Sequence, residues 1–114
     1  MRIELRTRGL GITDALRDHV VRRLDFALRR FGSEIDGVVG RLEDVNGPRG
    51  GRDKRCQLTI TGPRIGGLSF RAQGDDVYAA VAVLAERGAR GAHRERERRR
   101  ELHAGDTRTA RRAS

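Results

Sequence analysis

The sequence predicts an α+β domain in which a four-stranded sheet carries two helices on one face. Three observations lead to this fold class: short stretches that alternate apolar and polar residues, two longer stretches with helical periodicity, and glycine-rich segments between them. Their order along the chain is strand, helix, strand, strand, strand, helix (β-α-β-β-β-α). The clean alternation in the strands predicts that one sheet face is buried beneath the helices and that the other faces solvent.

The N-terminal part predicts a strand followed by an amphipathic helix. Ile3 and Leu5 alternate with charged residues, as in a half-buried strand. Thr13 is expected to cap a helix that runs from Asp14 to Phe31, and Gly32 to end it in a left-handed conformation. The apolar face of this helix comprises Leu16, Val20, Leu24, Ala27, Leu28 and Phe31.

The middle of the chain predicts the other three strands. We expect them at residues 38–45, 56–61 and 68–73. The segment 46–55 (NGPRGGRDKR) has the strongest turn chemistry in the chain, and GPRIGG at 62–67 forms a second turn.

The single cysteine, Cys56, has no partner for an intramolecular disulfide. It alternates with polar residues in step with Leu58 and Ile60, which predicts a small buried apolar side chain.

A second helix is predicted after Gly74, with Asp75 or Asp76 as its cap. After Arg87 we expect the apolar face to fade. Gly88 and Gly91 each cost about 1 kcal/mol relative to alanine in a helix interior, so we expect the distal helix to become ordered on a partner. We assign residues 1–100 to one domain and predict a disordered basic tail at 101–114. The apolar face of this helix comprises Val77, Ala80, Val81, Leu84 and Ala85.

Length and charge restrict the class of function. A chain of 114 residues holds one domain. Its 25 basic residues against 16 acidic ones give a net charge of +9, and a polyanion is the natural partner because each neutralised phosphate releases counterions. No apolar stretch is long enough to cross a bilayer, and the start MRIELRTRGLG lacks the apolar run of a secretory signal. We therefore expect a cytoplasmic protein with no membrane partner.

One candidate RNA-binding group lies on the second helix, where arginines recur at three- or four-residue steps and form a stripe beside the apolar face. Such a row can follow a phosphate backbone; alternatively it is a solvated face balanced by neighbouring glutamates. We favour the first interpretation because Arg87 and Arg90 have few acids nearby in the sequence. The stripe comprises Arg87, Arg90, Arg94 and Arg98.

The other candidate is the 46–55 segment, whose glycines would let the backbone approach a phosphate closely. Its basic residues include Arg49, Arg52 and Lys54. The alternative is a hairpin tip without a ligand, and the sequence does not distinguish the two.

Catalytic and metal-binding patterns are not evident. His19, His93 and His103 lie far apart in the pattern, and Asp75 and Asp76 are explained as a helix cap. Phe70 alternates as a core residue, which argues against base stacking on the sheet. We expect no enzymatic activity, cofactor, metal or small-molecule substrate.

Four stretches, taken in order, resemble the ribosome hibernation-promoting factor family, also called ribosome-associated inhibitors or sigma-54 modulation proteins. The resemblance covers about residues 1 to 100 and implies a fold related in shape to double-stranded-RNA-binding domains. Glycines 88 and 91 depart from apolar family positions. The family's long form adds a C-terminal domain that pairs ribosomes, which we do not expect here. The stretches are RIELRTRG, GITDALRDHVVRRLDFALRRFG, RLEDVNGPRGGRDKRC and GDDVYAAVAVLAERGAR.

The resemblance implies docking in the mRNA and tRNA channel of the small ribosomal subunit, with inhibition of translation by steric occlusion during stress or stationary phase. Basic side chains of both helices would contact 16S rRNA, and Tyr78, in Asp76-Val-Tyr-Ala-Ala, would anchor the start of the second helix. We expect a monomer when free. Two alternatives stay open: a general binder of structured RNA, and a protein-interaction module that acts on a transcription factor. The residues implied to contact RNA are Arg17, Arg22, Arg23 and Arg30 on the first helix, with Arg87, Arg90 and Arg94 on the second.

Overall fold

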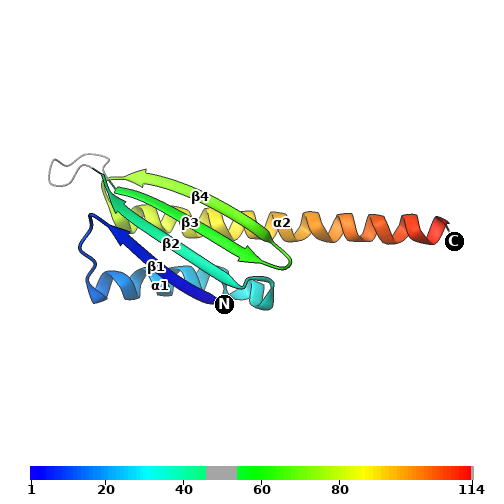
Figure 1. Ribbon diagram of the computed structural model, residues 1–114, viewed down its shortest axis with the longest axis horizontal. Coiled ribbons are helices and arrows are strands. Elements are labelled where there is room, and N and C mark those ends of the chain that lie inside the picture. The colour runs from blue at the N-terminus through cyan, green and yellow to red at the C-terminus, as the bar shows by residue number, and fades with distance from the viewer. Residues whose placement is uncertain (46–53, 114) are drawn as a thin grey trace.

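The computed structural model describes the backbone of residues 1–45 and 54–113, and the side chains of residues 1–45 and 54–102. The strands form one sheet in the order β1-β2-β3-β4, in which β1 and β2 are parallel and the other neighbours antiparallel. Both helices cover the same face of this sheet (Figure 1). The predicted α+β fold is therefore confirmed. The elements are β1 (Arg2–Arg8), α1 (Asp14–Leu28), the 3-10 helix η1 (Arg29–Glu34), β2 (Gly37–Asp44), β3 (Lys54–Gly62), β4 (Gly66–Gly74) and α2 (Val77–Ala113).

The core lies between the sheet and the two helices, and most of its members are those that the periodicities predicted. Ile35, Ile65 and Ala92 are also buried, although the periodicities did not predict them. Leu28 and Ile60 are fully buried, and Cys56 is only 2% exposed. Full burial of a leucine or isoleucine side chain stabilises the fold by about 1.5–3 kcal/mol. The other buried residues of the helices and central strands are Leu16, Val20, Leu24, Val38, Leu42, Leu58, Val77, Ala80, Val81, Leu84 and Ala85.

Helix α1 begins where predicted and ends earlier. The hydroxyl oxygen of Thr13 accepts a hydrogen bond from the Leu16 amide at 3.1 Å, as an N-cap does. The α-helix ends at Leu28 and continues as η1, so the prediction of an α-helix to Phe31 was wrong by one turn. A 3-10 turn tightens the helix end and carries the Phe31 side chain into the core, where it is 2% exposed. Gly32 has a positive φ of 54°, but its ψ of −128° is not that of the predicted left-handed cap, and the residue lies inside η1 rather than at the end of α1.

Helix α2 is capped by the second of the two candidate aspartates. A carboxylate oxygen of Asp76 accepts from the Tyr78 amide at 2.9 Å, and its carbonyl oxygen accepts from the Ala80 amide at 3.1 Å. The helix is therefore anchored at Asp76, directly after β4.

The two glycines of α2 lie where the helix approaches the sheet most closely. A Cβ atom on Gly88 would lie 2.7 Å from Leu58 Cδ2 and 3.2 Å from Ile60 Cδ1, and one on Gly91 would collide with the ring of Phe70. Without side chains, both residues let α2 pack against β3 and β4. The expectation that the apolar face fades after Arg87 was therefore wrong, because close packing offsets the low helix propensity of glycine.

Beyond the sheet, α2 extends as a single helix to Ala113 (Figure 1). The backbone thus differs from the disordered tail expected from residue 101. This segment contains no proline, and each residue added to an existing helix contributes one more backbone hydrogen bond. The placement of a domain boundary near residue 100 stays a prediction. Over the part of the chain that the structure describes, no helix is long and apolar enough to cross a membrane.

Candidate nucleic-acid interface

The two helices form one layer and present their outer sides to solvent. They lie side by side on the sheet and start at the same end of it (Figure 1). Near this end the rings of His19 and Tyr78 make an edge-on contact, with centroids 4.7 Å apart. The exposed charges of both helices therefore belong to one continuous side of the molecule.

All four arginines predicted on the first helix lie exposed on this layer. Arg22 Nε donates to the carbonyl oxygen of Asp18 at 3.2 Å. Arg30 falls in η1, and its guanidinium lies 5.0 Å from the ring centroid of Phe31. Arg17 and Arg23 form no ion pair with any residue whose side chain is described. These two have the most freely available charge among the four.

The α2 stripe begins at the β4 edge of the layer. Arg87 Nη1 donates to the carbonyl oxygen of Arg71, in β4, at 2.9 Å. The stripe therefore does not face the α1 arginines directly, because α2 itself lies between them. Arg94, two steps further along the stripe, is exposed and forms no ion pair within the described segments.

Glutamates one turn away neutralise part of the stripe. Arg90 pairs with Glu86, because a spacing of four residues brings the two side chains together on a helix, so one of the few local acids does neutralise it. Arg98 donates from both Nε and Nη2 to Glu95. The sequence thus identified the stripe but not its degree of pairing.

Glu95 accepts hydrogen bonds from two neighbouring arginines. The guanidinium groups of Arg98 and Arg99 lower the pKa of Glu95 to about 2, and Glu95 in turn raises the pKa of Arg98. All three groups are charged at neutral pH. The distal stripe is therefore a network of alternating charges with a basic excess.

The basic residues of the 46–55 segment fall into two groups. Arg49 and Arg52 lie outside the described residues. Lys54 Nζ lies 3.0 Å from Asp44 Oδ2, and the two side chains are only 19% and 11% exposed. Lys54 thus links β2 to β3 where the hairpin begins. A role for these residues in RNA binding stays a prediction.

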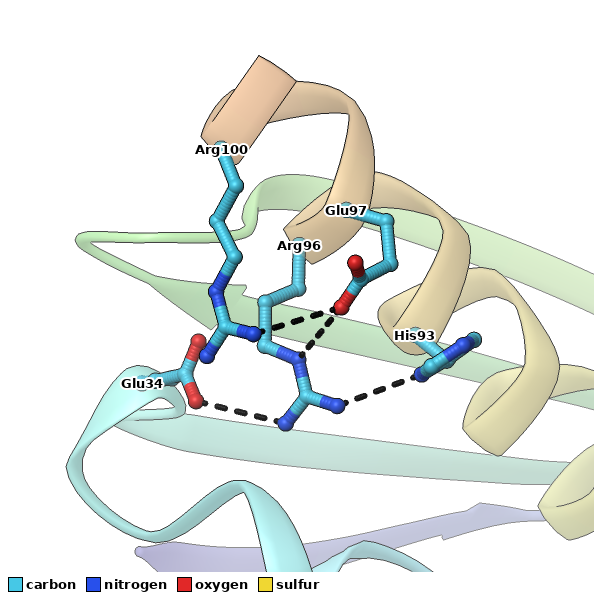
Figure 2. Close-up of polar contacts among 5 residues, drawn as sticks. All are labelled: Glu34, His93, Arg96, Glu97 and Arg100. Carbon is cyan, nitrogen blue, oxygen red and sulfur yellow. Dashed lines mark hydrogen bonds and ion pairs between the residues drawn. The ribbon is translucent and has the colours of Figure 1, made fainter. Parts of the chain in front are cut away.

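Arg96 is a residue whose environment sequence reasoning missed, because it lies in the highly charged run RERERRRE and was not singled out. Its side chain is only 18% exposed and points from α2 toward η1 (Figure 2). Its guanidinium lies 4.9 Å from the Phe31 ring, with Nη1 3.4 Å from Glu34 Oε1 and Nη2 3.2 Å from His93 Nδ1. Arg96 follows Ala85 and Ala92 at helical spacing, and this continuation of the buried face was the available signal.

The chemistry available on the described surface is that of ion and hydrogen-bond recognition. Within the described side chains, no three histidine, cysteine, aspartate or glutamate residues cluster closely enough to hold a metal ion. Burial raises the pKa of the Cys56 thiol to about 11, so this thiol is protonated at neutral pH. Exposed guanidinium groups, in contrast, suit the phosphates of a nucleic acid.

Comparisons with known proteins identify the family of this chain. Residues 3–100 match the family described as sigma 54 modulation protein / S30EA ribosomal protein. The structure is similar to the Protein Y N-terminal domain from Thermus thermophilus, at 25% identity and a TM-score of 0.68 over 82% of this chain and 98% of that one. A ribosomal subunit interface protein from Coxiella burnetii has the same fold, at 20% identity and a TM-score of 0.59 over 91% of this chain and 99% of that one. A comparison with curated proteins gave no significant match. With its family profile matched over nearly all of the described domain, the chain belongs to the sigma 54 modulation protein / S30EA ribosomal protein family.

Proposed function

We propose that this protein binds the small ribosomal subunit in its mRNA and tRNA channel and inhibits translation by steric occlusion during stress or stationary phase. Its partner would be 16S rRNA, and its site of action the cytoplasm. No bond is made or broken in this mechanism, because occupation of the channel is sufficient to exclude mRNA and tRNA.

Family membership is the observation that carries this proposal, since the family description names a ribosomal protein. The fold neighbour from Coxiella burnetii is described as a ribosomal subunit interface protein. The exposed arginines of α1 and α2 provide the physical basis for such binding. Arginine forms bidentate hydrogen bonds with phosphate oxygens, and neutralised phosphates release their counterions.

Co-sedimentation with purified small subunits tests the proposal. The wild type is compared with a helix variant (Arg87→Gln, Arg90→Gln, Arg94→Gln) at low and moderate salt. A control variant (Arg64→Gln, Arg99→Gln, Arg100→Gln) removes the same charge near the β3–β4 turn and from distal α2. We expect the wild type and the control to sediment with the subunit at moderate salt. The helix variant should remain at the top of the gradient, because it lacks three phosphate contacts.

Competition experiments then test the place of binding. Prebound tRNA or mRNA should exclude the protein if the channel is the site. Equal affinity for any RNA duplex, without competition, would favour a general binder of structured RNA. Failure of the wild type to bind subunits would contradict the proposal and favour a protein-interaction module.

A further inference from the structure

The open face of the sheet, opposite the helices, carries a second set of arginines. The strand register places Arg6, Arg41, Gln57 and Arg71 in one row across all four strands. Neighbouring strands are about 4.8 Å apart, so Arg41 and Arg71 lie roughly 10 Å from each other with Gln57 between them. These residues alternate with residues that are buried or packed against the core, so their side chains point away from the helices.

A second row lies next to the first, toward the 46–53 end of the hairpin. It contains Arg8, Glu43, Arg55 and Gln73, in register across the four strands. Glu43 is the only acid of the two rows, and Arg8 and Arg55 lie on either side of it. The two rows together therefore have a net positive charge.

Among the residues that the structure describes, none neutralises the arginines at the centre of this face. Arg41, Arg55 and Arg71 make no side-chain hydrogen bond or ion pair with any residue in the described ranges. On α2, by comparison, Arg90 and Arg98 are paired with glutamates. Arg41 faces Arg6 and Gln57 in register, and the charge of Arg6 is already paired with Glu4 at 3.0 Å, so no acid lies directly opposite Arg41. Such an arrangement is expected where a ligand supplies the missing negative charge.

These side chains surround a shallow hollow of about 650 Å³ on the sheet surface. Neutral hydrogen-bonding groups lie among the arginines, and Gln57 Nε2 donates to the hydroxyl of Ser69 at 3.0 Å in the adjacent row. The residues of the hollow that provide side chains on this face are Arg41, Glu43, Arg55, Gln57, Arg71 and Gln73.

We propose that this face, centred on Arg41, Arg55 and Arg71, is a second RNA-binding surface that takes the phosphate backbone of an RNA segment other than the one at the helices. The protein would then be held between two RNA segments, one on each side. This inference deepens the proposed function and rests on it, because it needs an RNA partner that surrounds the domain.

The composition of the face favours RNA over an acidic protein. The cores of protein interfaces are enriched in aromatic residues and methionine, and the two rows contain neither. Guanidinium and amide groups instead match phosphate oxygens and the 2′-hydroxyl. The absence of an exposed aromatic in these rows also predicts contact with the backbone rather than stacking on bases.

A sheet variant (Arg41→Gln, Arg55→Gln, Arg71→Gln) tests this surface on the intact protein. It is compared with the wild type, the helix variant and the control variant, all of which are first shown by thermal unfolding to be folded. Two quantities are measured with purified small subunits: the dissociation constant over a range of salt concentrations, and the rRNA positions that each protein protects from hydroxyl radicals.

We expect the sheet variant to bind roughly ten- to a hundredfold more weakly than the control variant at moderate salt. The slope of the logarithm of the binding constant against the logarithm of the salt concentration should be smaller in magnitude by about 2 to 3, close to one per lost phosphate contact. One protected rRNA segment should disappear in the sheet variant, and a different segment in the helix variant.

Other outcomes separate the two proposals. A sheet variant that equals the control in affinity, slope and protections overturns the second surface and leaves the proposed function intact. Weaker binding with an unchanged salt slope and unchanged protections assigns the face to a protein partner and overturns the RNA assignment. A wild type that does not bind subunits contradicts the proposed function and, with it, this inference.

Discussion

Two successive segments of α2 are held to the domain by different forces. Residues 77–92 pack apolar and small side chains against the sheet, and Gly88 approaches Leu58 and Ile60 without a side chain of its own. Residues 93–102 are held instead by Arg96, which pairs with Glu34 and lies over the Phe31 ring (Figure 2). Ion pairs of Glu95 with Arg98 and Arg99 link successive turns within this segment. One helix therefore has a first part fixed by packing and a second part fixed by charge.

This difference matters for the basic stripe, which extends over both segments. Arg87 and Arg90 project from a rigid, close-packed part of the helix, whereas Arg98 belongs to the charge network of the second part. Surface charge pairs weaken as the salt concentration rises and as a carboxylate becomes protonated at low pH, whereas contacts between apolar side chains carry no charge to be screened or titrated. The stripe therefore presents positive charges on a rigid part of α2 at Arg87 and Arg90, and a charge in a less tightly packed part at Arg98.

The largest effect is expected from filling the close contact in the first segment. Gly88→Val places a branched side chain against Leu58 and Ile60, and overpacking of this kind costs about 1–3 kcal/mol. Urea denaturation measures the loss in the free energy of unfolding. Ala79→Val, at an exposed position of the same segment, should cost less than about 0.7 kcal/mol, since only helix propensity changes. Equal stabilities of the two variants would contradict close packing at Gly88.

A smaller effect is expected from Arg96 in the second segment. Arg96→Met keeps the side-chain volume but leaves Glu34, only 21% exposed, without its cation, and should cost about 1–2 kcal/mol. Arg90→Met breaks an exposed pair with Glu86 and should cost under about 0.5 kcal/mol. Adding Glu34→Gln should recover part of the stability of Arg96→Met but not that of Arg90→Met. Urea denaturation of the two single variants and of the same variants with Glu34→Gln added checks the comparison. No recovery of the free energy of unfolding in the Arg96→Met background would contradict the pairing of Arg96 with Glu34.

The smallest effect is expected from protonation of Glu95. Because its pKa in the folded protein, about 2, is below the ordinary value of 4.5, its stabilising contribution is complete above pH 4.5 and is lost as the pH falls toward 2. The effect should be confined to the second segment, whose helicity can be followed by circular dichroism and amide hydrogen exchange. Glu95→Gln should show less helix than the wild type at pH 5, and the two should converge near pH 2. A constant difference across this range would contradict a role for the Glu95 carboxylate.

The sequence by itself determined the features that depend on neighbours along the chain. The order of elements, the apolar faces and the buried position of Cys56 followed from periodicity. The cap at Thr13, and a second cap at Asp75 or Asp76, followed from the hydrogen-bonding ability of short polar side chains next to a helix start, and the structure selects Asp76. Such features are local, because a helix or strand places each residue at a known angle relative to the next few.

Only the tertiary structure decided which distant residues meet. Gly88 and Gly91 looked like weak points of a helix until the sheet was placed against them. Arg96 looked solvated until η1 brought Glu34 and Phe31 to it, and Arg41, Gln57 and Arg71 became a row through strand register. The physical reason is the same in each case: packing and register join residues far apart in the chain, and periodicity within one element shows which face a residue is on but not which distant residue it meets.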